Sequence, residues 1–209
     1  MAGLPFKIQN IDEDIELEIA NAYDILKNNF QISAAASTIP IDLNKFDLLC
    51  NTGDVRVAFA LDVNCARGEF NILFVDAHFI PITNSRDGLP HDYFATQVWG
   101  FVKLKKDFGR VLIRRETFAD KIVGLVHHVE LKFADDQPFN NKFYVLANDS
   151  EKALNALNWS FRNVIMGIDD EDIIIEILGD LLIIGNGKYP DAAQISNIAE
   201  IAGNITSLR

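Results

Sequence analysis

Histidine side chains are the first groups from which this chain could build a metal-binding or catalytic site. His127 and His128 form the only adjacent pair. On a strand, neighbouring side chains point to opposite faces of the sheet, so these two cannot chelate one metal ion together. A metal site would need one of them with His78, His91 or carboxylates from other strands. The pattern favours the alternative, in which one histidine of the pair is buried and the other exposed.

Acidic and sulfur-containing side chains offer a second route to chemistry. Asp169-Asp-Glu-Asp172 is a continuous acidic run, but it lacks the alternation and the central glycine of an EF-hand loop. The run therefore indicates a solvated turn that ends a helix. Cys50 and Cys65 have no metal-ligand spacing and form no disulfide framework. They predict two buried free thiols, with a single disulfide as the alternative.

Sequence motifs of the common enzyme classes are absent. The chain has no Gly-x-Ser-x-Gly nucleophile elbow, no phosphate-binding loop and no Gly-x-Gly-x-x-Gly dinucleotide fingerprint. We therefore predict no catalytic, cofactor-binding or metal-binding residue and no cofactor. An enzyme whose site is assembled from scattered His, Asp and Glu residues stays open as an alternative.

Charge distribution points to a binding role instead. The net charge is −11, which disfavours nucleic acid, because nucleic-acid binding needs a basic surface to neutralise phosphates. Residues 103–121 nevertheless hold seven basic and three acidic side chains. If 103–115 is a hairpin, Lys103 and Lys105 share a face, and Arg114 or Arg115 could lie opposite them. Such a patch could bind a small anion or an acidic partner.

A structural interpretation of the same basic segment is favoured over the functional one. The charges could belong to an exposed sheet face or to an edge strand that resists aggregation. They could also form ion pairs with the acidic N-terminal helix.

The elements that must position these groups follow from hydrophobic periodicity. Helical spacing predicts helices over residues 11–30, 150–166 and 190–207. Alternation of apolar and polar residues predicts strands between them. The predicted strands cover 55–63, 72–82, 93–106 (one long strand, or two with a kink near Gly100), 111–115, 124–133 and 139–147, followed by a hairpin over 173–184.

This order predicts an α+β fold, with a mainly antiparallel sheet and helices on one face. We expect one domain over residues 1–209, with a sheet core at 54–188 and a C-terminal helix at 190–207. The N-terminal helix, within residues 1–32, could pack separately. An apolar fraction of 49% is enough for a sizeable core.

One segment resembles a known family. Phe139-Asn-Asn-Lys-Phe143 is followed by Asn148-Asp149, by Ala153-Leu154 in a helix and by a hairpin at Leu178-Gly-Asp-Leu-Leu182. With these motifs, the stretch from about His127 to Lys188 resembles a DUF3137-like bacterial domain of unknown function. The resemblance implies no catalytic residues. The chain departs from the family at Asn141, where relatives tend to carry a basic residue, and in lacking their membrane helices.

The same segment also has a structural interpretation. On a regular strand, Phe139 and Phe143 would share one face, and Val145 would continue it. We interpret the motif as a folding signature rather than a site.

Together these patterns predict a non-catalytic soluble binding or protein-interaction domain. Its partner would be another protein or a small anion, held by the sheet face or by the basic patch, and a homodimer is one arrangement that fits. We find no run of about 18 apolar residues that could span a membrane, and the N-terminus lacks the apolar core of a signal peptide. We therefore expect a cytoplasmic protein. A membrane-surface accessory protein is a further alternative.

Overall fold

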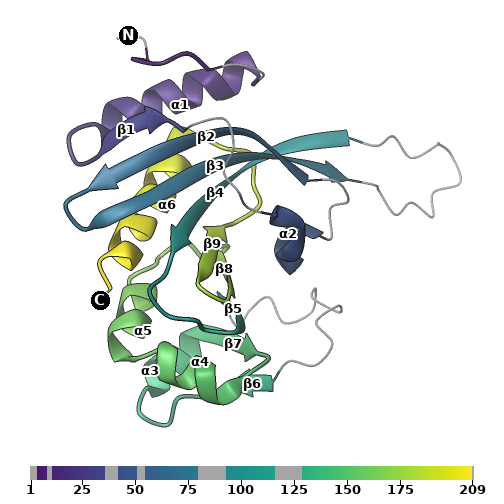
Figure 1. Cartoon of the computed structure of the whole chain (residues 1–209), viewed down its shortest axis with the longest axis vertical. Coiled ribbons are helices and arrows are strands. Elements are labelled where there is room, and N and C mark those ends of the chain that lie inside the picture. Colours follow the sequence, from purple (N-terminus) through teal and green to yellow (C-terminus); the bar gives the residue numbers. More distant parts are fainter. Residues whose placement is uncertain are drawn as a thin grey trace, which may run out of the picture.

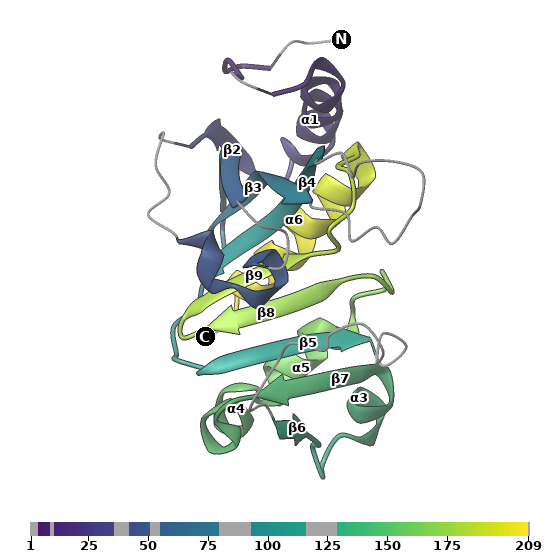
Figure 2. The same cartoon turned by 90° about the vertical axis from the view of Figure 1, so that its right-hand side faces the viewer.

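The structure is a computed structural model that describes residues 4–8, 11–35, 42–50, 55–79, 93–115 and 129–208. Within these residues, a nine-stranded antiparallel sheet runs in the order β1-β2-β3-β4-β9-β8-β5-β7-β6 (Figures 1 and 2). The strands are β1 (Gln31–Ala34), β2 (Val55–Cys65), β3 (Gly68–Phe79), β4 (Tyr93–Lys103), β5 (Arg110–Arg115), β6 (Val129–Leu131), β7 (Phe143–Ala147), β8 (Ile174–Leu178) and β9 (Leu181–Gly185).

Helices flank this sheet and include one near each end of the chain, as the α+β prediction requires. They are α1 (Glu13–Leu26), the 3-10 helix η1 (Leu43–Lys45), α2 (Asp47–Cys50), α3 (Gln137–Lys142), α4 (Ser150–Ala156), α5 (Trp159–Met166) and α6 (Ala192–Thr206). Asp12 caps α1 by accepting a hydrogen bond from the backbone N–H of Asp14, and Asp191 caps α6 in the same way through Gln194.

One face of the sheet, here the first face, packs against all the longer helices. Alternate strand residues, such as Ile72 and Phe74 on β3, point into this core and are fully buried. Helix α6 lies against β3 and β4, and α1 packs on α6 (Figure 1). Ile15 and Ile19 of α1 belong to the same buried cluster as the sheet residues.

Within the described segments, η1 and α2 cover part of the opposite face, here the second face. Leu43, Phe46 and Leu49 from this segment pack on side chains that alternate with those of the first face. The sheet residues in this smaller cluster are Ala60, Leu73, Val75, Trp99, Phe101 and Ile183.

A buried carboxylate ties the η1–α2 segment to the sheet. Glu176 on β8 is 1% exposed and accepts hydrogen bonds from the backbone N–H groups of Asp47 and Leu48, at 2.9 Å each. Arg110 on β5 forms an ion pair with Asp47, with Nη1 and Oδ2 2.5 Å apart, and donates to the carbonyl of Lys45 at 2.6 Å. These bonds replace the water that the buried carboxylate has lost.

The segment around Phe139 differs from its prediction. Phe139 lies on the short helix α3 and not on a strand, and β7 begins only at Phe143. The reason is local: Asp136 caps the helix by accepting a bond from the Phe139 N–H, and Pro138 fits the first helical turn. Both phenylalanines are still core residues, with ring centroids 5.2 Å apart.

The predicted helix over 150–166 is also interrupted. It divides into α4 and α5 because the Asn158 side chain accepts a hydrogen bond from the Phe161 N–H and caps a new helix. The second helix, α5, contacts α3 and α6, and its Phe161 and Ile165 are buried in the main core.

Candidate functional site

The second face of the sheet changes from apolar to polar beyond the cover that η1 and α2 provide. Register places Ser33, Asp62, Asn71 and Phe101 side by side across β1 to β4. In this row only Phe101 belongs to the small core under η1 and α2. The polar side chains therefore border that core on a part of the face that no described helix covers.

A second cross-strand row extends the polar surface. Asn64 on β2 is opposite Glu69 on β3, and Lys103 on β4 is opposite Leu181 on β9. The two rows line a groove that encloses about 1060 Å³ of space open to solvent. We call it the open-face groove. Its lining residues are Ser33, Asp62, Val63, Asn64, Glu69, Phe70, Asn71, Phe101, Lys103 and Leu181.

Hydrogen-bond donors and acceptors both line the open-face groove. The Asn71 side-chain amide donates to Asp62 Oδ1 at 2.6 Å, which fixes the orientation of both side chains. The ammonium group of Lys103 is exposed and has no ion pair with any side chain that the structure describes. The groove can therefore donate and accept hydrogen bonds, and Phe101 and Leu181 supply an apolar margin.

Among the described residues, no group of three or more His, Cys, Asp and Glu side chains is placed to hold a metal ion. The described part of the chain also contains no helix long and apolar enough to cross a membrane.

The predicted basic patch does not assemble, because the two strands that carry it, β4 and β5, do not pair with each other. β4 pairs with β3 and β9, whereas β5 pairs with β7 and β8. Lys103 is paired with Leu181, at the turn of the β8–β9 hairpin. Arg114 is paired with Ile174, at the open end of the same hairpin. Arg114 is moreover only 4% exposed and lies over the Tyr144 ring at 5.0 Å.

The other members of the predicted patch have separate surroundings. Arg115 donates to the carbonyl of Ile168 at 2.7 Å and lies over the Phe143 ring at 4.9 Å, so it fastens the connection between α5 and β8. Lys103 lines the open-face groove, and Lys105 lies in the connection between β4 and β5. A role of these residues in binding an anion stays a prediction.

The histidine site falls largely outside the described residues. His91, His127 and His128 are not among them, and the His78 side chain on β3 is not described. The acidic run forms a turn, in which Asp170 accepts hydrogen bonds from the Asp172 N–H at 2.9 Å and from the Asn186 side chain at 3.2 Å.

The cysteine prediction needs one correction. Cys65 is a free thiol but is half-buried rather than buried, because it lies at the end of β2 next to the turn into β3. The side chain of Cys50 lies outside the described set.

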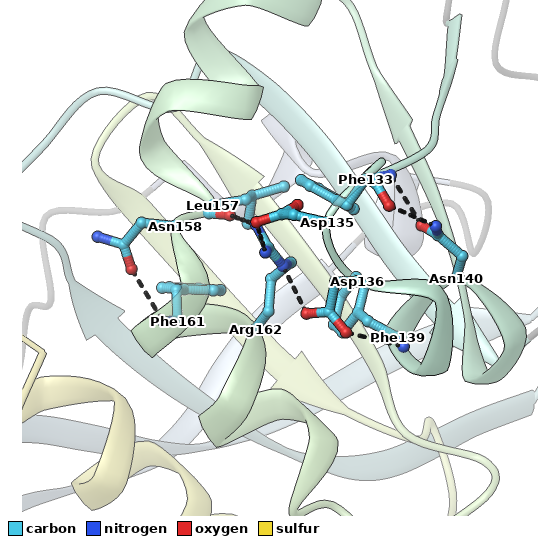
Figure 3. A network of polar contacts seen from close by, with 9 residues as sticks. All are labelled: Phe133, Asp135, Asp136, Phe139, Asn140, Leu157, Asn158, Phe161 and Arg162. Carbon is cyan, nitrogen blue, oxygen red and sulfur yellow. Dashed lines mark hydrogen bonds and ion pairs between the residues drawn. The ribbon is translucent and has the colours of Figure 1, made fainter.

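A second polar cluster, around Arg162 on α5, is closed and structural (Figure 3). The guanidinium group is 3% exposed and donates to Asp135 and Asp136 at 2.8 Å each, and to the carbonyl of Leu157 at 2.9 Å. It also lies 4.5 Å from the centre of the Phe133 ring. Through these bonds Arg162 holds the segment before α3 against α5.

Sequence reasoning missed the open-face groove as a site. Its signal was the alternation of Asp62 and Asn64 with buried residues on β2, and of Glu69 and Asn71 on β3. Such alternation is typical of any half-exposed sheet. Only the partial cover by η1 and α2 distinguishes this part of the face.

Comparisons with known proteins give a fold but no family. No protein-family model and no curated protein matches the sequence, so the DUF3137-like resemblance stays a prediction. Among solved structures, the chain is similar to the crystal structure of the mycobacterial trehalose monomycolate transport factor A, TtfA. The TM-score is 0.53 at 11% sequence identity, covering 89% of this chain and 90% of that one. At this identity the likeness concerns the fold alone.

Proposed function

We propose that this chain is a non-catalytic binding domain whose open-face groove holds a hydroxyl-rich ligand of the sugar class. The observation that carries the proposal is the row of polar side chains on an uncovered sheet face, where carboxylate, amide, hydroxyl and ammonium groups are neighbours. A sugar hydroxyl both donates and accepts a hydrogen bond, so it can pair with each of these groups.

The charges in the groove further restrict the class of ligand that it can bind. The groove contains the carboxylates of Asp62 and Glu69 against the single ammonium of Lys103, so an anionic ligand is disfavoured. The half-buried Leu181 at the margin can contact the C–H face of a sugar ring. The groove therefore fits a neutral polyol better than a small anion.

The experiment is a nuclear magnetic resonance titration of the ¹⁵N-labelled protein with disaccharides. Trehalose is the first probe because it occurs in the name of the structural neighbour, and maltose and cellobiose follow. We expect amide shifts at the groove positions of β2, β3 and β4. Asn71→Ala should weaken binding about fivefold, the value of one net hydrogen bond.

Asn163→Ala on the exposed side of α5 is the matched control, since it removes the same group away from the groove. It should leave the affinity unchanged. Absence of shifts with all three disaccharides at millimolar concentration, or equal affinity in the Asn71→Ala variant, would overturn the sugar proposal. Release of monosaccharides during the titration would instead identify an enzyme.

A further inference from the structure

A hollow separate from the open-face groove lies between the β4–β5 connection, the junction of α4 and α5, and Leu208, which follows α6. It encloses about 430 Å³ of space open to solvent. We call it the loop hollow. It differs from the groove in having apolar walls and lysines at its edge.

The walls of the loop hollow are mostly buried apolar side chains. Phe108 and Phe161 are 4% and 3% exposed, and their ring centroids lie 5.2 Å apart. Ala156 is buried beside them, and Leu104 and Leu208 are half-buried. An apolar group that entered the hollow would leave water for contact with these side chains.

The loop that carries the lysines is held in place by backbone bonds. The Leu104 N–H donates to the carbonyl of Asp180 at 2.7 Å, and the Phe108 N–H donates to the carbonyl of Gly179 at 2.8 Å. Both acceptors are in the β8–β9 turn. The loop is therefore anchored at two points, and Lys105 and Lys106 lie between them.

Charge at the edge of the hollow is unbalanced. Asp107 is the acid within this loop, and it is engaged by Lys152, whose Nζ lies 2.9 Å from Asp107 Oδ2, and by the Gly109 N–H at 2.7 Å. Lys105 and Lys106 are exposed, and no carboxylate of the described residues forms an ion pair with either. In a chain with a net charge of −11, such a pair of cations next to an apolar hollow favours a ligand with an anionic end.

We propose that the loop hollow binds a small organic acid with an apolar body, such as a medium-chain or aromatic carboxylate. The body lies in the hollow against the exposed edges of the Phe108 and Phe161 rings, which pack on each other, and the carboxylate lies at the edge against Lys105 and Lys106. Ser160 lines the same edge and offers a hydroxyl donor to the carboxylate. This site is independent of the sugar-binding proposal, because the two hollows have no lining residue in common.

The test compares octanoate with 1-octanol, which has a chain of the same length and no charge. Both are titrated into the ¹⁵N-labelled protein, and amide shifts are followed at Lys106, Ser160 and Phe161. We expect octanoate to shift these amides and to bind more tightly than octanol. In the Lys105→Gln and Lys106→Gln double variant, octanoate affinity should fall at least about fivefold, and octanol affinity should not change.

Lys103→Gln is the matched control, since this lysine is close in sequence but lines the open-face groove. It should leave octanoate binding unchanged. A second variant, Ser160→Leu, places bulk at the exposed edge and should weaken both probes. The proposal is wrong if octanoate does not shift these amides, if the double variant binds it as tightly as the wild type, or if the shifts map to the groove.

Discussion

At the scale of single residues, the buried charged groups of this protein have structural partners. Glu176 accepts two backbone N–H bonds from the start of α2, and Arg110 bridges Asp47 and Lys45. Arg162 is enclosed by two carboxylates and a carbonyl. Groups with partners of this kind hold segments together, whereas the exposed polar groups of the open-face groove remain available to a ligand.

Glu176 gives a prediction about pH. Burial raises the pKa of its carboxyl group above the ordinary 4.5, against the opposing effect of the Leu48 and Asp47 N–H groups. The folded protein therefore binds this proton more tightly than the unfolded chain does. The contribution of Glu176 to stability is thus fully present below pH 4.5 and is lost as the pH rises through the raised pKa.

Comparison with Glu176→Gln isolates this effect, because glutamine does not titrate. Urea unfolding of both proteins below and above this pH window is the measurement. The free energy of unfolding of the wild type, relative to the variant, should decrease as the pH rises. A difference that stays constant or increases with pH would contradict the raised pKa.

At the scale of elements, close packing decides how α6 lies on the sheet. Gly100 on β4 faces this helix, and a Cβ atom placed there would lie 2.9 Å from a methyl carbon of Ile184 and 2.9 Å from one of Ile198. The sequence predicted either one long strand or two strands with a kink near Gly100. The structure shows a continuous β4, in which Gly100 permits the close approach of strand and helix.

Gly100→Ala is therefore expected to destabilise the protein by about 1–3 kcal/mol, the usual cost of overpacking a core. Chemical denaturation measures this loss. The same substitution should cost less in an Ile198→Ala background, where one of the two close methyl groups is gone. Equal costs in the two backgrounds would show that α6 does not press on Gly100.

At the scale of the whole molecule, a single sheet connects the two ends of the chain. The N-terminal helix α1 packs on the C-terminal helix α6, and α6 packs on β3 and β4 in the middle of the chain. We therefore propose that the 209 residues fold as one cooperative unit and that α1 does not unfold by itself.

Ile19→Ala tests this cooperativity. Ile19 on α1 is fully buried, so its truncation should cost about 2–5 kcal/mol. In a Trp159→Phe background, which removes an exposed indole, fluorescence reports Trp99 in the sheet. Fluorescence and far-ultraviolet circular dichroism should shift together in one transition. A transition of Trp99 that Ile19→Ala leaves unmoved would show that α1 unfolds separately.

Local patterns alone were sufficient for much of the fold. Helical spacing predicted α1 and α6, and the alternation of apolar and polar residues over 55–63 and 72–82 predicted β2 and β3. The Gly179-Asp180 pair predicted the β8–β9 hairpin, since Gly179 has a φ of 65° that glycine adopts readily. In each case the residues that determine the element are neighbours in the sequence.

Tertiary structure decided the rest, because it depends on which distant segments are buried together. Sequence could not show that β4 pairs with β9 and β5 with β8, which separates Lys103 from Arg114. Nor could it show that Asp136 caps a helix that replaces the start of the predicted strand 139–147, or that Asn158 caps a second helix within the predicted helix 150–166. The open-face groove has the same origin. A polar face of a strand looks alike in sequence whether or not a helix covers it, and here η1 and α2 stop short of Asp62 and Asn71.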